Sequence, residues 1–173
     1  VTDSARAIAR AAGVELVDYF ARPELTVYNA IPTAEGCIGI LLERRSRTLW
    51  DAAVLVLGFG PVGRALAVRL AALGARVTVA ARRPVQRAMA EELGLRAVPL
   101  TDLAAAAAAF DTVVNTIPAP VLTAAVLAAL PKGCLIVDLA SKPGGTGFAA
   151  ARRLGPTALH ALSLPTVWAP ETA

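Results

Sequence analysis

A buried strand pattern runs directly into three spaced glycines near the middle of the chain, and this junction constrains the fold more than any other feature. The apolar run at 53–57 is followed by Gly58, Gly60 and Gly63, and a helical pattern begins at once. A strand, turn and helix with the spacing G-x-G-x-x-G is typical of a Rossmann domain, which holds a dinucleotide pyrophosphate there. The unpaired N–H groups at the start of the helix would face the anion.

Each glycine of this loop has a separate predicted role. The first permits the tight turn, the second lets the backbone approach the phosphates, and the third lets the helix pack closely on the strand. We predict cofactor contacts along the whole loop, at Gly58, Phe59, Gly60, Pro61, Val62 and Gly63. The alternative interpretation, a purely structural turn, is less consistent with the strand and helix on either side.

Two arginines follow the next predicted strand, at the position that selects between NAD and NADP. In NAD-selective domains an acid about 20 residues after the glycines binds the ribose 2′-hydroxyl. Here Arg82 and Arg83 stand instead, and a guanidinium group can pair with a 2′-phosphate through two parallel hydrogen bonds. The sequence therefore favours NADP(H) over NAD(H) as the cofactor. The alternative is that both arginines are solvated loop residues.

Strands and helices alternate regularly from residue 49 onward. Strand patterns cover residues 53–57, 76–80, 96–98, 112–116, 134–139 and 157–161. Helical patterns lie between them at 61–73, 84–93, 101–109, 120–130 and 146–154. Uninterrupted apolar runs such as 134–137 indicate strands buried on both faces of a parallel sheet. The predicted fold is α/β, with a Rossmann-type doubly wound parallel sheet over residues 49–173.

The segment before residue 49 does not fit this dinucleotide-binding unit. Residues 4–12 resemble the end of a helix with Gly13 after it, and 14–17 resemble a short strand. We interpret residues 1–30 as the tail of a truncated second α/β domain. A helix that begins at Pro32 would bridge the two domains over residues 31–48.

The segments after the fourth and fifth predicted strands complete the candidate site, because open parallel sheets bind ligands at the carboxyl ends of their strands. The predicted cofactor contacts there are Thr116, Ile117, Pro118, Asp138 and Ser141. A further prediction assigns substrate contacts to Lys142, Gly144 and Gly145. The alternatives are a structural acid that caps a turn at Asp138, a solvated lysine, and a simple glycine turn.

The composition argues against several other functions. The net charge is +4 over 173 residues, but the arginines are scattered without a basic stripe, so we expect no nucleic acid binding. With His160 as the single histidine, and Cys37 and Cys134 far apart, we predict no metal site and two buried cysteines. The apolar runs are too short and too broken by charge to span a membrane. We expect a cytoplasmic protein.

Three aromatic side chains are interpreted as structural rather than catalytic. His160 falls in a predicted buried strand, which favours a core or edge residue over a general acid. Trp50 and Trp168 are interpreted as packing residues. The catalytic groups therefore stay unidentified.

Several segments together resemble the A subunit of dipicolinate synthase. They are residues 29–36, 58–63, 81–82, 115–118, 138–145 and 164–173. The resemblance implies an NAD(P)-dependent oxidoreductase that converts dihydrodipicolinate, a small dicarboxylate, to dipicolinate during bacterial sporulation. It also implies that the partner is a flavoprotein-like B subunit. We expect the cofactor half alone to be inactive, and a homo-oligomer is compatible with the sequence.

Two other functions stay open. One is the cofactor domain of a 2-hydroxyacid dehydrogenase relative, which would need an arginine and a histidine beside the substrate. The position of His160 counts against it. The other is a nucleotide-binding sensor module without catalytic activity.

Overall fold

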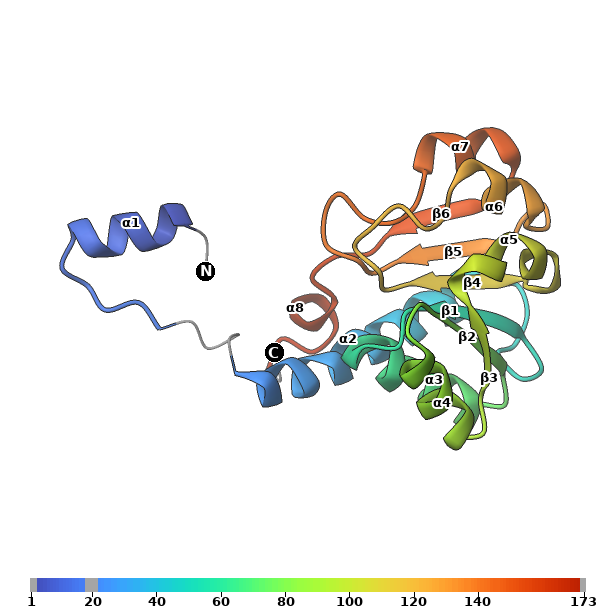
Figure 1. Cartoon of the computed structure of the whole chain (residues 1–173), viewed down its shortest axis with the longest axis horizontal. Helices are drawn as coiled ribbons and strands as arrows, with labels where there is room; N and C mark the ends of the chain where they lie inside the picture. Colours follow the sequence, from blue (N-terminus) through green and yellow to red (C-terminus); the bar gives the residue numbers. More distant parts are fainter. Residues whose placement is uncertain (1–2, 18–21, 172–173) are drawn as a thin grey trace.

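The computed structural model describes residues 3–17 and 22–171, and its core is one sheet of six parallel strands (Figure 1). The strand order is β3-β2-β1-β4-β5-β6. The strands are β1 (Ala53–Leu57), β2 (Arg76–Ala81), β3 (Arg96–Pro99), β4 (Thr112–Asn115), β5 (Leu135–Asp138) and β6 (Thr157–His160). This order, which reverses between β1 and β4, is that of the Rossmann fold. The predicted doubly wound α/β sheet is confirmed.

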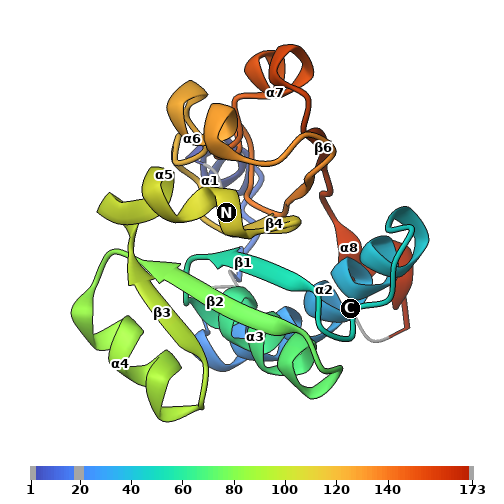
Figure 2. The same ribbon diagram turned by 90° about the vertical axis from the view of Figure 1, so that its right-hand side faces the viewer.

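Helices cover both faces of the sheet, as Figure 2 shows. The first face packs against α2 (Pro23–Arg44), α3 (Pro61–Ala72), α4 (Pro84–Glu92) and α8 (Leu164–Trp168). The second face packs against α5 (Leu103–Ala106), α6 (Ala124–Ala129) and α7 (Phe148–Leu154). Alternate residues of each strand point to opposite faces, so Val56 enters the first core and Leu57 the second. Both are fully buried, as the uninterrupted apolar runs predict.

Helix α2 begins at Pro23, nine residues before the predicted start at Pro32. That prediction is wrong, because the helix continues through Pro32 although a proline lacks the N–H of the regular helical hydrogen bond. Packing against α3 and α8 supports the helix there and buries Ala34, Cys37 and Leu41. Among the described residues α2 is the one helix long and apolar enough to span a membrane. The expectation that every apolar run is too short is therefore wrong for this helix, and 33% of its apolar window is buried inside the fold.

Trp168 of the C-terminal helix α8 packs on two glycines of α2. A Cβ on Gly39 would lie 2.5 Å from Cζ3 of Trp168, and a Cβ on Gly36 would lie 3.0 Å from Cδ1 of the same ring. The two glycines thus form a flat seat for the indole. Trp50 packs on Gly74 in a similar way, although 71% of it stays exposed. Both tryptophans pack against glycines.

An ion pair joins the end of α2 to the amino end of β4. Arg45 donates from Nη1 to Oδ1 of Asp111 at 2.7 Å and also to the hydroxyl of Thr112. Only 7% of the Arg45 side chain is exposed. Burial raises the pKa of Asp111, but the hydrogen bonds from Arg45 and Thr112 outweigh it and hold the pKa below its ordinary value.

Two predicted helices on the second face of the sheet differ from the structure. The helix predicted at 101–109 is divided into a 3₁₀ turn, α5 and a second 3₁₀ turn. Asp102 does not cap it, because its Oδ1 accepts a hydrogen bond from the Thr101 hydroxyl instead. The helix predicted at 120–130 shortens to α6, since the N–H groups of Val121 and Leu122 donate to the carbonyl oxygen of Gly145.

The N-terminal segment lies apart from the sheet in Figure 1. Helix α1 (Asp3–Ala11) is followed by Gly13 at φ +64°, as predicted. Residues 14–17 are not a strand, and the predicted strand there is wrong, since a strand needs a neighbour with which to pair. Ile8 and Val17 are 67% and 73% exposed. The assignment of 1–30 to a second domain stays a prediction.

Candidate dinucleotide-binding site

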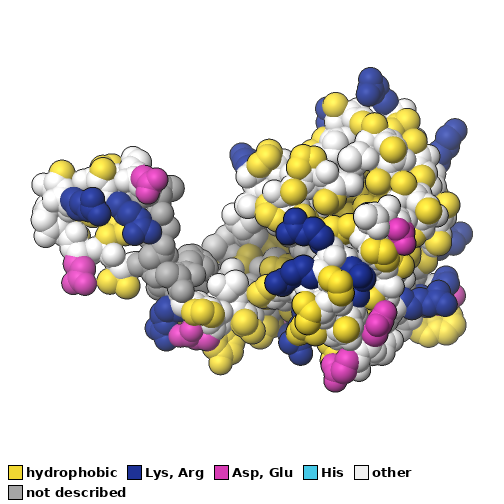
Figure 3. Space-filling view, viewed as in Figure 1, with side chains coloured by type: hydrophobic (Ala, Val, Ile, Leu, Met, Phe, Trp, Pro, Cys, Tyr) yellow, Lys and Arg dark blue, Asp and Glu magenta, His cyan; other side chains and the backbone are white. Residues whose placement is uncertain are grey.

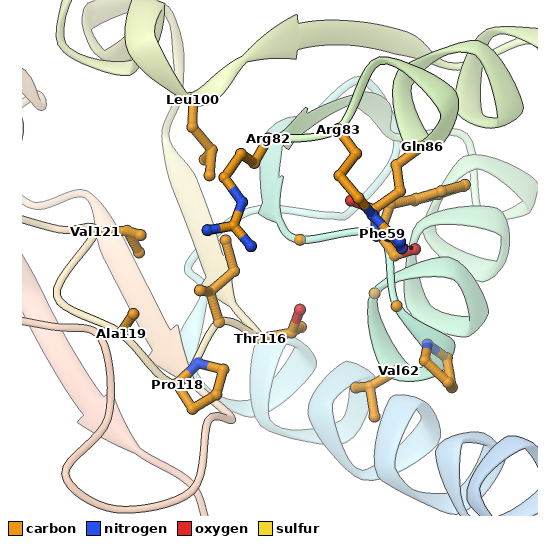
Figure 4. Close-up of a pocket in the computed structure, with 15 residues that line it drawn as sticks. Phe59, Val62, Arg82, Arg83, Gln86, Leu100, Thr116, Pro118, Ala119 and Val121 are labelled. Carbon is orange, nitrogen blue, oxygen red and sulfur yellow. Dashed lines mark hydrogen bonds between the residues drawn. The ribbon is translucent and has the colours of Figure 1, made fainter. Parts of the chain in front are cut away.

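A cavity of about 670 Å³ opens at the carboxyl ends of β1, β2 and β4, where the strand order reverses. Figure 4 shows the side chains around it. The lining contains the whole predicted glycine loop, both predicted arginines and the segment after β4. These predicted residues are Gly58, Phe59, Gly60, Pro61, Val62, Gly63, Arg82, Arg83, Thr116, Ile117 and Pro118. The structure therefore brings them to one place.

The first glycine of the loop is required by both its backbone and its neighbour. Gly58 has φ +93°, which L side chains rarely adopt. A Cβ there would lie 2.5 Å from Oγ1 of Thr116. That hydroxyl is itself fixed, because it donates to the carbonyl oxygen of Leu57 at 2.8 Å. The end of β1 and the loop after β4 are thus in direct contact under the cavity.

The second and third glycines differ in what surrounds them. Gly60 has an extended backbone (φ −82°, ψ −171°), and a Cβ there would meet no heavy atom of the described chain within 4 Å. Gly63 lies in the first turn of α3, where a Cβ would lie 2.2 Å from the carbonyl oxygen of Gly58. Open space at Gly60 suits a phosphate group, whereas Gly63 allows α3 to begin against the strand.

The two arginines have exposed side chains at the end of β2. Figure 4 shows the Arg82 guanidinium directed into the cavity, and Arg83 belongs to the same lining. Within residues 3–17 and 22–171 neither forms an ion pair. Arg87 has a different role, since its Nη1 donates to the carbonyl oxygens of Ala81 and Arg82, at 3.0 Å each. It braces the loop and leaves both predicted arginines available to an anion.

Four lining residues were not predicted from the sequence: Gln86, Leu100, Ala119 and Val121. Gln86 donates from Nε2 to the carbonyl oxygen of Phe59 at 3.2 Å, and so ties α4 to the glycine loop. Its position in the first turn of a helix that leaves the carboxyl edge was an available signal. Leu100 follows the end of β3 at the same edge.

A second hollow, of about 730 Å³, adjoins the first between α2, α3 and α4. The residues it shares with the cavity are Phe59, Gly60, Pro61, Arg83 and Gln86. It is otherwise lined largely by apolar side chains such as Val68 and Met89. The space-filling view in Figure 3 shows basic side chains grouped among apolar ones near the middle of the body. Both hollows contain arginines in their lining.

Asp138 does not line the cavity, contrary to its predicted cofactor contact. It is fully buried, and its carboxylate accepts hydrogen bonds from Asn115 Nδ2 at 2.8 Å, Gly145 N at 2.9 Å and Ala140 N at 3.1 Å. These contacts agree with the alternative interpretation, a structural acid at the end of a strand. Through Asn115 and Gly145 the side chain joins the end of β4 to the turn after β5.

The remaining predicted residues of the β5–α7 turn also lie outside the cavity lining. Ser141 and Lys142 are exposed. Gly144 has φ +83° and packs against Asp138, while a Cβ on Gly145 would lie 2.5 Å from Asn115 Nδ2. The two glycines thus have a packing role in this structure. Contact of this turn with a substrate stays a prediction.

Three other candidate groups are accounted for by packing. His160 is half-buried, with Nε2 2.8 Å from the carbonyl oxygen of Ala140 and its ring against Phe148. Cys37 and Cys134 are buried, and burial raises the pKa of each thiol to about 12. Across the described ranges no group of three or more His, Cys, Asp or Glu residues could hold a metal ion.

Comparison with known proteins agrees with this geometry. Residues 40–141 match the family described as the NAD binding domain of D-isomer specific 2-hydroxyacid dehydrogenase. The A subunit of dipicolinate synthase from Bacillus subtilis (strain 168) is 40% identical over 166 residues, which cover 96% of this chain and 56% of the relative. The chain thus spans little more than half the length of that relative.

Solved structures lead to the same group. The A subunit of dipicolinate synthase from Bacillus halodurans has a TM-score of 0.94 at 39% identity, over 99% of this chain and 59% of that protein. The Bacillus subtilis structure has a TM-score of 0.93 at 38% identity, over 99% and 58%. A transhydrogenase from Sinorhizobium meliloti, at TM-score 0.63 and 22% identity over 71% of this chain and 42% of that protein, shares the fold alone. The chain therefore belongs to the family of the NAD binding domain of D-isomer specific 2-hydroxyacid dehydrogenases, and over nearly its whole length it is similar to the dipicolinate synthase A subunit.

Proposed function

We propose that residues 49–173 are the cofactor domain of an oxidoreductase that converts dihydrodipicolinate to dipicolinate in a sporulating bacterium. The observation that carries the proposal is the cavity at the strand-order reversal, bounded by a glycine loop whose Gly60 faces open space. The similarity to the A subunit of dipicolinate synthase supports the choice of substrate. When bound, a nicotinamide would accept the hydride, while the protein supplies position and electrostatics.

The residues present fit a dinucleotide. The N–H groups in the first turn of α3 would face the pyrophosphate beside Gly60, and Pro61 at the first position of that helix costs one donor that the helix leaves unpaired in any case. A wall formed by residues 117–121 closes the other side of the cavity. We propose NADP(H) as the preferred cofactor and NAD(H) as the weaker one, because Arg82 and Arg83 are free to pair with a 2′-phosphate.

The complete enzyme would contain more than this chain. We propose that residues 1–30 belong to a second α/β domain, and that the rest of α2 bridges the two domains. The small dicarboxylate substrate would bind between them. Lys142, exposed in the turn after β5, would neutralise one substrate carboxylate. The enzyme would have a flavoprotein-like B subunit as its partner and would be cytoplasmic. It would also form a homo-oligomer that covers the apolar hollow between α2, α3 and α4.

One observation favours a second function. The family match over residues 40–141 also suits a domain that oxidises or reduces a 2-hydroxy acid. That chemistry needs a proton donor near the substrate, and the one histidine, His160, is hydrogen-bonded to the Ala140 carbonyl. We therefore place the 2-hydroxyacid reaction second.

Two measurements test the proposal. Calorimetric titration of this chain with NADPH and with NADH should show binding of both, with NADPH the tighter. A longer protein that includes the second domain should oxidise dihydrodipicolinate with NADP⁺, whereas residues 1–173 alone should not turn over, because one domain cannot orient the substrate. If neither NADPH nor NADH binds, the assignment of a nicotinamide cofactor is overturned. Turnover of a 2-hydroxy acid in place of dihydrodipicolinate would select the second function.

A further inference from the structure

Two buried polar side chains meet beneath the wall of the cavity. Asn115 ends β4, Asp138 ends β5, and the two residues are partners in the strand register. Both are fully buried. A carboxylate and an amide in such a place are tolerated only when their hydrogen bonds are satisfied, so the contacts they make are informative.

The amide of Asn115 holds the backbone of Ile117 from both sides. Its Nδ2 donates to the carbonyl oxygen of Ile117 at 3.0 Å, and its Oδ1 accepts from the N–H of Ile117 at 3.0 Å. Nδ2 also donates to Asp138 Oδ1 at 2.8 Å. An ionised carboxylate can only accept, so Asp138 fixes which end of the amide faces it. The orientation that holds Ile117 is therefore set by Asp138.

The other carboxylate contacts reach the far end of the same wall. Asp138 Oδ2 accepts from the N–H of Gly145 at 2.9 Å. The carbonyl oxygen of Gly145 in turn accepts from the N–H groups of Val121 and Leu122, at 3.2 and 2.9 Å. The wall at 117–121 is thus held at Ile117 through Asn115 and at Val121 through Gly145. Both connections begin at one carboxylate.

We propose that Asp138 is a positioning residue for the dinucleotide site, which acts through Asn115 and Gly145 without touching the cofactor. The segment it holds supplies Ile117, Pro118, Ala119 and Val121 to the cavity lining. A wall already fixed in its bound position spares the dinucleotide the entropy cost of ordering it. The inference rests on the dinucleotide binding proposed above and assigns that binding a residue outside the cavity.

The substitution Asp138→Asn tests the idea with almost no change in shape. One acceptor oxygen becomes an NH₂ group that faces an N–H donor, so at least one of the three hydrogen bonds is lost. We expect the Kd for NADPH to rise about tenfold, as the loss of one such bond to a charged group implies. Amide hydrogen exchange of Ile117 and Val121 should become faster in the free variant, and saturating NADPH should slow it again.

The matched control is Asp102→Asn, which makes the same chemical change at an exposed acid hydrogen-bonded to Thr101. It should leave both readouts unchanged. Should Asp138→Asn fail to fold, Asn115→Ala takes its place. It removes both bonds to Ile117 while Asp138 keeps the N–H groups of Gly145 and Ala140.

The outcomes separate the proposals. Wild-type affinity for NADPH in a folded Asp138→Asn or Asn115→Ala variant would overturn the positioning role. So would faster exchange spread evenly over the sheet, because that indicates a general loss of stability. If the wild-type chain binds no dinucleotide at all, the proposed function fails first.

Discussion

Gly63 lies so close to Gly58 that a Cβ on Gly63 would stand 2.2 Å from the Gly58 carbonyl oxygen. Backbone therefore meets backbone where α3 begins against the end of β1. This contact brings the positive end of a 12-residue helix to the edge of the cavity. Gly60, three residues earlier, has no such neighbour in the described chain.

The two glycines give a matched pair of substitutions. Gly63→Val should lower the free energy of unfolding by about 1–3 kcal/mol or more through overpacking, and should weaken NADPH binding because α3 moves. Gly60→Val should leave stability nearly unchanged, since its extended backbone suits valine, yet should abolish binding. Denaturant unfolding and calorimetry measure the two effects. Normal NADPH binding by Gly60→Val would show that the phosphates do not lie on this loop.

Cofactor preference should follow the arginines after β2. Replacing both Arg82 and Arg83 with alanine should weaken NADPH binding by roughly 2–4 kcal/mol, at about 1.5–3 kcal/mol for each charge-assisted hydrogen bond, with some overlap. NADH affinity should barely change. Of the single variants, Arg82→Ala should have the larger effect, because Figure 4 shows its guanidinium within the cavity. Equal losses for both nucleotides would contradict the 2′-phosphate assignment.

The sequence predicted the sheet well because most of its strands are rich in apolar residues. Val56 and Ile136 belong to apolar runs that suit burial on both faces, and the glycine spacing identified the first strand and helix. It failed at Pro32, where a local rule about proline was overridden by packing against α3 and α8. It also failed at Val121, whose N–H pairs with Gly145, a partner that no local pattern reveals.

For the site, the sequence could assign residues to an edge but not always to a direction. Thr116 follows β4 and Asp138 ends β5, so both lie at the carboxyl edge of the sheet. Thr116 lines the cavity, whereas Asp138 is buried beneath its wall. The difference depends on how the turn after β5 folds back on the loop after β4. That is a contact between distant segments, and spacing alone cannot supply it.

The Asp111–Arg45 pair predicts a pH-dependent contribution to stability. The pKa of Asp111 is lowered in the folded state from its ordinary value of 3.8, so its stabilisation is present above about that pH and is lost as the pH falls through the folded value. Asp111→Asn should cost roughly 1 kcal/mol at pH 7, a figure reduced for the half-exposed carboxylate.

The cost should shrink toward zero in unfolding curves recorded below pH 4, near the ordinary value of 3.8. Asp51→Asn is the control, because Asp51 pairs with Arg76 where both side chains are more than 60% exposed. It should change stability little at any pH. A difference for Asp111→Asn that stays constant with pH would argue against the ion pair.

Both cysteines should be unreactive in the native protein. Burial raises the pKa of Cys37 and Cys134 to about 12, so almost no thiolate exists at pH 8, and the thiolate is the nucleophile. A disulfide reagent such as dithionitrobenzoate should report no fast reaction until denaturant is added, when both thiols should react. Rapid modification of one native thiol would show that its surroundings open readily.

The packing of Trp168 on Gly36 and Gly39 of α2 affects the order in which the chain folds. Gly36 and Gly39 each lower the intrinsic helix stability of α2 by about 1 kcal/mol relative to alanine, and the ring that packs on them lies near the opposite end of the sequence. Such a distant contact forms late, since a long loop must first close. We expect Trp168→Ala to accelerate unfolding more than it slows refolding in stopped-flow experiments. On the ribosome, the packing of α2 would be completed only after the residues up to Trp168 had followed it.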